Sequence, residues 1–139
     1  MSRNGSKEER DVVKMFEKYG FGAIRVPASG ARTKSDKPDV IAGNGRIYYA
    51  VEVKSSKNNY IYIRDEQINE LFRFATSFGA VPLVVAKFTR EPYVAYNPHL
   101  MMKTNSGKYK IQRKWVAEAD YFENILQDIC MSDVKINEK

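Results

Sequence analysis

The feature that most constrains the fold of this chain is a predicted β-hairpin over residues 39–54. Two apolar runs flank the dipeptide Asn44-Gly45. Asn-Gly between apolar runs is the strongest short-range signal for antiparallel strands joined by a two-residue turn. The chain is therefore expected to contain a β-sheet, and the register of this hairpin decides which of its side chains share a face.

The residues of the hairpin can be paired by counting outward from the turn. A two-residue turn pairs Asp39 with Ala50. Directly opposed residues share a face, and so do alternate residues along each strand. Glu52 and Lys54 therefore lie on the face of Ala50. Asp39 joins that face as a diagonal neighbour of Glu52. The opposite face carries an apolar row suited to a core: Ile47, Tyr49, Val51 and Val53. A three-residue turn would instead separate the charged residues.

Helix and strand patterns surround this hairpin. Ser6 and Glu9 have capping-box spacing before an apolar helical stripe that ends near Gly20. Two more helices are expected, over residues 65–78 and around residues 122–129. The expected further strands cover residues 23–26, 60–63, 81–88 and 93–96, whereas residues 97–114 are basic and expected to be irregular. This order predicts an α/β fold with a central mixed β-sheet flanked by α-helices.

Length and charge bound the class of protein. With 139 residues the chain is expected to form a single domain, residues 1–139. The formal net charge of +6 suits a polyanionic partner, although a solvated basic surface explains it equally well. No apolar run approaches the roughly 20 residues that span a bilayer. The N-terminus lacks the apolar stretch of a secretion signal. We expect no membrane association.

Cysteine and histidine each occur once, as Cys130 and His99. A single cysteine allows no disulfide framework, which fits a reducing cytoplasm as the expected location. A zinc site or a Cys–His nucleophile pair needs more of these residues. Any catalytic chemistry is therefore expected to come from carboxylates and basic side chains.

The hairpin brings two carboxylates together. Asp39 and Glu52 repel each other unless a cation or a proton lies between them. Mg²⁺ suits such a pair because it takes one or two carboxylates and leaves positions for water and phosphate oxygens, and Mn²⁺ is expected to substitute for it. Lys54 is placed to orient an attacking water or to neutralise a transition state. The alternative is a surface strand with solvated charges.

These residues also carry a resemblance to a known family. Pro38-Asp39 followed by Glu52-Val53-Lys54 resembles the PD-(D/E)xK nuclease signature of the restriction-endonuclease-like superfamily. The segments GSKEERDVV, PDVIAGNG, YYAVEVKSS and FGAVPLVVAKF, with residues 20–30, are similar to the archaeal Holliday junction resolvases of the Hjc and Hje group. The resemblance implies a restriction-endonuclease-like fold and covers roughly the first two thirds of the chain.

The resemblance also assigns roles to residues that spacing alone does not. It makes Glu9 a third metal ligand beside Asp39 and Glu52, whereas its position fits a helix cap equally well. It places Ser29 near the scissile phosphate, where the alternative is an ordinary turn serine. Gln67 resembles a glutamine of some related nucleases and is at least as readily a surface amide.

DNA and a second subunit are the partners that the resemblance implies. Arg10 and Arg25 match basic residues of the resolvases, and the loop residues Arg32 and Lys57 are expected to bind DNA beside the site. The resolvases are homodimers, and the match gives Phe74 and Phe78 to the dimer interface. Simple deep burial of this helix is the commoner explanation for its wide apolar stripe.

The expected function is therefore a metal-dependent endonuclease for DNA recombination and repair. It would resolve four-way (Holliday) junctions by hydrolysing phosphodiesters in paired symmetric cuts. One alternative is another nuclease of the same superfamily, of restriction or repair type. A different class is a non-catalytic DNA-binding module, which would tolerate loss of the carboxylates, and all of them are present here.

Overall fold

The structure is a computed structural model that describes residues 6–27 and 37–137. Within these residues the chain forms three α-helices: α1 (Ser6–Lys18), α2 (Asp65–Phe78) and α3 (Phe122–Asn137). The strands are β1 (Gly22–Arg25), β2 (Val40–Gly43), β3 (Tyr48–Ser56), β4 (Tyr60–Arg64), β5 (Val81–Phe88), β6 (Val94–Tyr96), β7 (Lys108–Gln112) and β8 (Asp120–Tyr121). Two short 3₁₀ helices, η1 (Pro98–Leu100) and η2 (Arg113–Glu118), complete the order.

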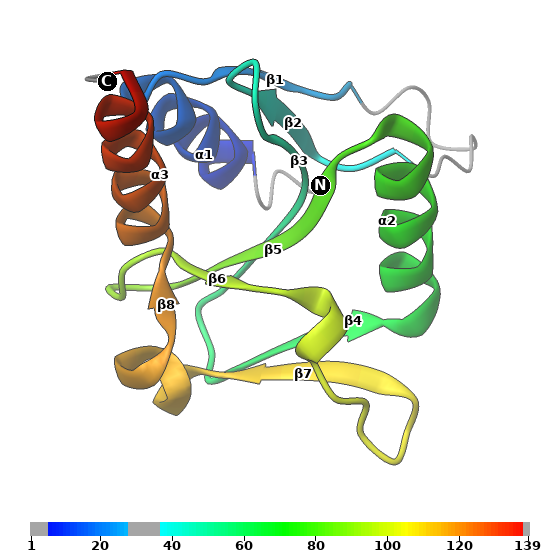
Figure 1. Cartoon of the computed structure of the whole chain (residues 1–139). Coiled ribbons are helices and arrows are strands. Elements are labelled where there is room, and N and C mark those ends of the chain that lie inside the picture. Colours follow the sequence, from blue (N-terminus) through cyan, green and yellow to red (C-terminus); the bar gives the residue numbers. More distant parts are fainter. Residues whose placement is uncertain (1–5, 28–36, 138–139) are drawn as a thin grey trace.

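The central sheet is mixed, as the sequence predicts. Its six strands lie in the order β1-β2-β3-β5-β6-β8, with β3 and β5 parallel and the other neighbours antiparallel. Helices α1 and α3 pack on one face, and α2 packs on the other together with a separate ribbon of β4 and β7 (Figure 1). No helix in the described ranges has the length and apolar character needed to cross a membrane.

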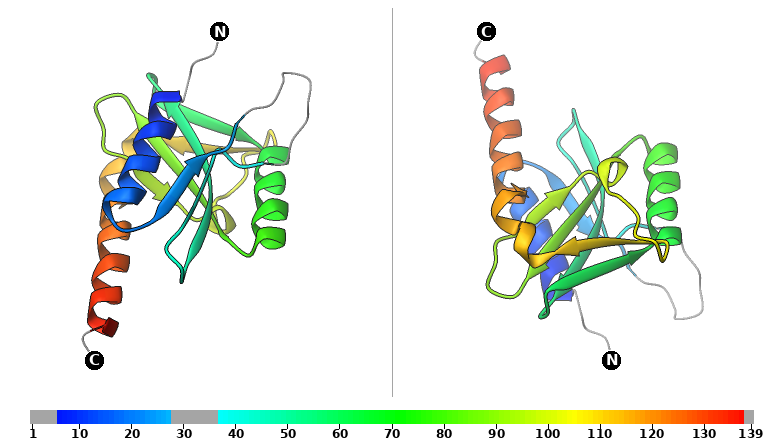
Figure 2. Two further views of the ribbon diagram at one scale, coloured as in Figure 1. Left: turned by 90° about the horizontal axis from the view of Figure 1, so that it is seen from above. Right: turned by 90° about the horizontal axis from the view of Figure 1, so that it is seen from below.

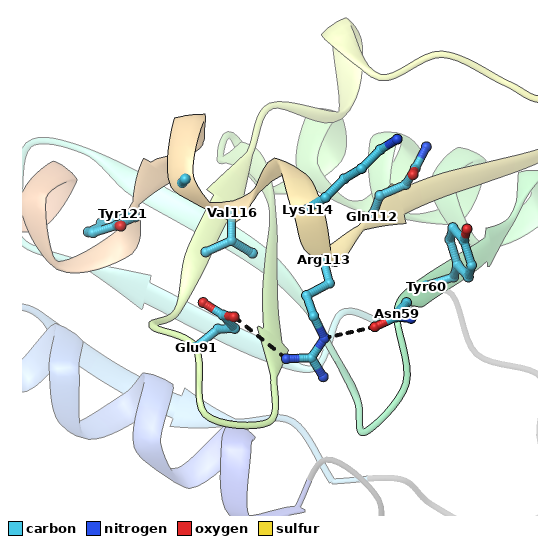
Figure 3. Close-up of a pocket in the computed structure, with 9 residues that line it drawn as sticks. Asn59, Tyr60, Glu91, Gln112, Arg113, Lys114, Val116 and Tyr121 are labelled. Carbon is cyan, nitrogen blue, oxygen red and sulfur yellow. Dashed lines mark hydrogen bonds and ion pairs between the residues drawn. The ribbon is translucent and has the colours of Figure 1, made fainter.

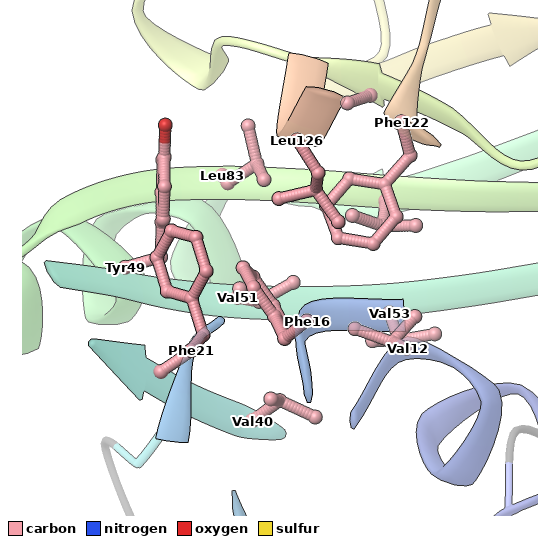
Figure 4. Close-up of a cluster of buried hydrophobic side chains, with 13 residues drawn as sticks. Val12, Phe16, Phe21, Val40, Tyr49, Val51, Val53, Leu83, Phe122 and Leu126 are labelled. Atoms are coloured by element: carbon pink, nitrogen blue, oxygen red, sulfur yellow. The ribbon is translucent and has the colours of Figure 1, made fainter. Parts of the chain in front are cut away.

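Aromatic side chains dominate the core under α1 and α3 (Figure 4). The ring of Phe16 lies 5.1 Å from that of Phe21, 5.1 Å from Phe122 and 5.9 Å from Tyr49. Phe16 and Phe122 are fully buried. Burying a side chain of this size stabilises the fold by about 1.5–3 kcal/mol. This core fixes the position of β3, because Tyr49, Val51 and Val53 of that strand point into it.

The register of the hairpin differs from the prediction. The connection between β2 and β3 is a four-residue loop, not a two-residue turn, and Gly43 pairs with Tyr48 rather than with Arg46. The side chain of Asn44 closes this loop, since its Oδ1 accepts hydrogen bonds from the backbone N–H groups of Arg46 at 2.9 Å and Ile47 at 2.8 Å. The shift is an even number of residues, so the faces are as predicted.

Residues 97–114 are less irregular than predicted. Lys108–Gln112 form β7, which pairs antiparallel with β4 from Tyr60↔Gln112 to Arg64↔Lys108. The prediction of an irregular segment was therefore wrong for these residues. The buried residues Tyr109 and Ile111 account for the strand, because they alternate with polar neighbours and pack against the second core below α2.

Candidate active site

Asp39 occupies the residue just before β2, at the edge of the buried sheet. The register in which Val40 pairs with Val51 places Asp39 opposite Glu52, closer than the diagonal position predicted from a two-residue turn. One carboxylate oxygen of Asp39, Oδ2, accepts a hydrogen bond from the backbone N–H of Val53 at 2.9 Å. The strand that carries Glu52 therefore also orients the Asp39 carboxylate.

Glu52 and Lys54 lie on the same face of β3, as predicted. Lys54 Nζ is 3.5 Å from Glu52 Oε2, and the two side chains are only 25% and 13% exposed. Burial and the neighbouring charge of Asp39 raise the pKa of Glu52 to about 8, although Lys54 opposes the shift. Burial also raises the pKa of Asp39, which lies within hydrogen-bonding range of Glu52. These carboxyl groups hold a proton unless a cation replaces it.

Glu9 stands next to this pair but is held by a different partner. Its Oε1 accepts a hydrogen bond from Arg25 Nε at 3.1 Å and lies 3.1 Å from Arg25 Nη2. The same guanidinium donates to Ser6 Oγ at 3.1 Å, so Arg25 ties β1 to the first turn of α1. Burial and the charge of Asp39 raise the pKa of Glu9 against the effect of Arg25. Glu9 is thus electrostatically coupled to the Asp39–Glu52 pair.

The donor set fits a hard divalent cation held by two carboxylates. Within residues 6–27 and 37–137, no three His, Cys, Asp or Glu side chains come close enough together to bind a metal as a group. Mg²⁺ does not require three, because it is commonly held by one or two carboxylates with water and phosphate oxygens. Asp39 and Glu52 supply the two carboxylates that such a site needs. The role of Glu9 as a third ligand stays a prediction.

The predicted DNA-binding residues fall into two groups. Arg10 is exposed on α1, one residue after Glu9, and Lys57 is exposed in the β3–β4 turn. Arg25, by contrast, is engaged with Glu9 and Ser6. Ser29 and Arg32 lie outside the described residues.

Arg113 is a residue of this region that the sequence did not single out (Figure 3). It lies at the start of η2 and holds the β3–β4 turn, donating to the carbonyl oxygens of Lys57 at 3.2 Å and Asn58 at 3.0 Å and to Asn59 Oδ1 at 3.2 Å. It also donates to the carbonyl of Thr89 at 2.8 Å. The turn that carries Lys57 is thereby fixed against the β5–β6 connection. No local pattern reveals this clamp, because its partners lie far away along the chain.

The remaining predicted residues, Gln67, Phe74 and Phe78, all lie on α2. Gln67 Oε1 accepts from the backbone N–H of Arg64 at 3.4 Å and so caps α2. The rings of Phe74 and Phe78 stack at 5.2 Å, and Phe78 is 52% exposed. Phe78 borders a shallow apolar hollow of about 230 Å³, shared with Ile24 and Tyr48.

Known proteins resemble the chain over most of its length. The family model described as archaeal Holliday junction resolvase (Hjc) matches residues 1–132. A protein of Archaeoglobus fulgidus named crossover junction endodeoxyribonuclease Hjc is 37% identical over 111 residues, 80% of each chain. Its namesake in Methanocaldococcus jannaschii is 35% identical over 124 residues, covering 88% of this chain and 87% of that protein.

A solved structure gives the same result for the fold. The structure of Archaeoglobus fulgidus Hjc, described as a Holliday junction resolvase, superposes with a TM-score of 0.78 at 31% identity. The match covers 88% of this chain and 99% of that one. The restriction-endonuclease-like fold predicted from the sequence is therefore confirmed. By its sequence, its fold and the extent of both matches, the chain belongs to the archaeal Holliday junction resolvase (Hjc) family.

Proposed function

We propose that the chain is a magnesium-dependent endodeoxyribonuclease that resolves four-way DNA junctions in recombination and repair. The observation that carries this proposal is the half-buried Asp39–Glu52 pair with Lys54 beside it, where the start of β2 meets β3 in a resolvase-type fold. The names of the relatives support the substrate, since they are called crossover junction endodeoxyribonucleases. The free thiol of Cys130 is consistent with action in the cytoplasm.

The chain's own residues have distinct tasks in this hydrolysis. Asp39 and Glu52 would hold Mg²⁺ or Mn²⁺, which supplies Lewis-acid activation of water and neutralises charge on the scissile phosphate. Val53 holds the Asp39 carboxylate in place through its backbone N–H. The Lys54 ammonium lies next to the same carboxylates, where it stabilises negative charge that builds on the phosphoryl oxygens. Arg10 and Lys57 contact the phosphate backbone on either side.

A homodimer would give the paired cuts that resolution requires. The exposed apolar side chains of Phe78, Ile24 and Tyr48 border one hollow and offer a surface that a second copy could bury. A two-fold dimer presents two active sites to a junction that is itself nearly two-fold symmetric. We therefore place the partner subunit against the C-terminal end of α2.

Cleavage of three end-labelled DNA substrates tests the proposed function. A four-way junction, a plain duplex of the same sequence and a flap are each incubated with the protein in Mg²⁺ or in EDTA. We expect paired cuts in opposing strands of the junction in Mg²⁺ and none in EDTA, because the two carboxylates need the cation to act.

Two results would contradict the proposal. Equal cutting of the duplex would remove junction selectivity and favour another nuclease of the same superfamily. Junction binding without cutting under every metal condition would leave only a DNA-binding module. Sedimentation of the protein at micromolar concentration checks the dimer, and Phe78→Glu should convert it to a monomer by introducing a charge into the apolar hollow.

A further inference from the structure

One face of the β4–β7 ribbon points to solvent, whereas the other is buried in the core. Ile61, Ile63, Tyr109 and Ile111 point into the core below α2. The alternating residues point outward and are cross-strand neighbours: Tyr60 with Gln112, Tyr62 with Lys110, and Arg64 with Lys108. These six residues are called the tyrosine–lysine face below. Within residues 6–27 and 37–137, no helix or strand packs on its outer side (Figure 2).

The charged residues of this face, Arg64, Lys108 and Lys110, are all basic. Residues 92–117 contain five lysines or arginines and no aspartate or glutamate. Among the described residues, Lys108 and Lys110 form no ion pair with a carboxylate. Acidic residues do approach one end of the face, where Glu66 lies 3.8 Å from Arg64. Glu118 and Asp120 line the same cavity as Lys110 but form no ion pair with it. The ammonium groups of Lys108 and Lys110 therefore stay available to a polyanion.

The side chains of the face are held in a defined arrangement. The Lys110 ammonium lies 4.6 Å from the centre of the Tyr60 ring and 6.0 Å from that of Tyr62. The two rings are 6.2 Å apart and are 45% and 50% exposed. A lysine held over aromatic rings loses less side-chain entropy when it binds an anion. The tyrosine hydroxyls add hydrogen-bond donors of the kind that contact phosphates.

The face adjoins the side of the molecule that carries the active site. Both views of Figure 2 show the first turn of α1, the β3–β4 turn and the β5–β6 turn pointing to the same side. Strand β4 begins three residues after Lys57, so the face starts where the proposed DNA contacts of the active site end. Tyr60 and Lys114 also border an open cavity of about 530 Å³ beside Arg113 (Figure 3). A DNA helix leaving the active site can follow this edge onto the ribbon.

We propose that the tyrosine–lysine face binds the sugar–phosphate backbone of a duplex arm of the DNA substrate, away from the cut site. This inference rests on the proposed junction nuclease function. Duplex rather than single-stranded DNA fits, because Lys110 already lies over the tyrosine rings on which unpaired bases would have to stack. The contacts are to phosphates, so the face gives affinity and orientation without sequence preference.

Binding measured against arm length and salt tests this inference. The full chain carries Asp39→Asn to prevent cutting, and fluorescence anisotropy compares four-way junctions whose arms span about one or about three helical turns. In this background Lys108→Ala/Lys110→Ala should weaken binding to the long-armed junction. The slope of log K against log salt should become shallower by about two, since each phosphate contact contributes about 0.9. Binding to the short-armed junction should not change.

The matched control removes two lysines from another face. Lys14→Ala/Lys18→Ala makes the same change in net charge on α1, which packs on the opposite side of the central sheet, and it also removes the ion pair of Lys18 with Glu123 at 2.7 Å. This control should change the affinity for the long-armed junction and its salt dependence less than Lys108→Ala/Lys110→Ala does. Thermal unfolding shows whether each variant is folded before it is compared.

Three outcomes would overturn the inference. Equal salt slopes for the parent and Lys108→Ala/Lys110→Ala on long arms would mean that the face is solvated or binds a protein instead. An equal loss on short and long arms would place these lysines at the junction centre. An equal loss in the control would show a general effect of charge. If the parent itself does not prefer junctions to duplex, the proposed function fails first, and the result is distinct from these three.

Discussion

The two faces of strand β3 differ sharply although their residues alternate along one backbone. Tyr49, Val51 and Val53 point toward α1 and are buried among aromatic rings. Glu52 and Lys54 point the other way and are also mostly buried, yet they carry charge. One face thus stabilises the fold, whereas the other holds groups that burial destabilises. The strand is a rigid support on which the apolar face fixes the position of the charged one.

Partial burial of the charged face changes the pKa values of its carboxyl groups. The pKa of each of the three acidic residues in and beside the site, Glu9, Asp39 and Glu52, is raised, with burial as the largest cause. Two carboxylates outside the site, Asp11 and Glu123, behave in the opposite way. Lysine neighbours lower the pKa of Asp11 and that of Glu123. Carboxyl groups with raised pKa values that lie together in one cluster are typical of functional sites.

Asp39→Asn should produce the largest effect and should act on one face only. It keeps an oxygen for the hydrogen bond from Val53 but removes a negative charge from the proposed metal site. Junction cleavage in Mg²⁺ should fall by at least about a thousandfold, which corresponds to roughly 4 kcal/mol of transition-state stabilisation. Stability should be unchanged or higher, because Glu52 loses a like-charged neighbour. Single-turnover cleavage and thermal unfolding measure the two effects, and a variant that cuts normally would rule out this site.

Phe122→Ala should lower stability and leave junction cleavage intact, the reverse of the effect of Asp39→Asn. Phe122 is fully buried at the start of α3, against Phe16. Removing its ring should lower the free energy of unfolding by about 3–5 kcal/mol, measured by urea denaturation. Junction cleavage per folded molecule should be retained at low temperature, because the ring does not touch the carboxylates. A folded variant that had lost cleavage would show that the two faces of the sheet are not independent.

Sequence reasoning recovered the faces of β3 but not its exact register. Side chains alternate with a period of two, so an error of two residues leaves every face unchanged. The loop length could not be read, because the Asn44 side chain replaces the expected tight turn with hydrogen bonds to Arg46 and Ile47. The strand β7 did have a signal, the alternation of Lys108, Tyr109, Lys110 and Ile111, which the high charge of the segment obscured.

The residues of the candidate site also include some that the sequence predicts and some that it does not. Asp39, Glu52 and Lys54 were predictable because one hairpin carries all of them. The partner of Glu9 was not predictable, because Arg25 reaches it from a different element through tertiary packing. The Arg113 clamp has no sequence signal for the same reason, since it joins η2 to turns that precede it by more than twenty residues. Local sequence patterns therefore predict which side chains one helix or hairpin exposes on a given face. Contacts between elements that are distant in the sequence depend on tertiary packing and are not predicted in this way.

Among the effects on stability, that of Glu52→Gln should be the smallest, a change in how the free energy of unfolding depends on pH. Burial raises the pKa of Glu52 in the folded protein from its ordinary value of 4.5 to about 8. Between these pH values the folded state binds more protons than the unfolded state, so the free energy of unfolding should fall as pH rises. In EDTA, the parent should lose about 1–3 kcal/mol more than Glu52→Gln between pH 5 and pH 8, given about 1.4 kcal/mol per pH unit for one proton. Mg²⁺ should restore much of this loss at pH 8 in the parent alone, because the cation replaces the proton between Asp39 and Glu52. Thermal and urea unfolding from pH 5 to pH 8 measure this difference. Parallel pH profiles for the two proteins would mean that ionisation of Glu52 does not destabilise the folded state.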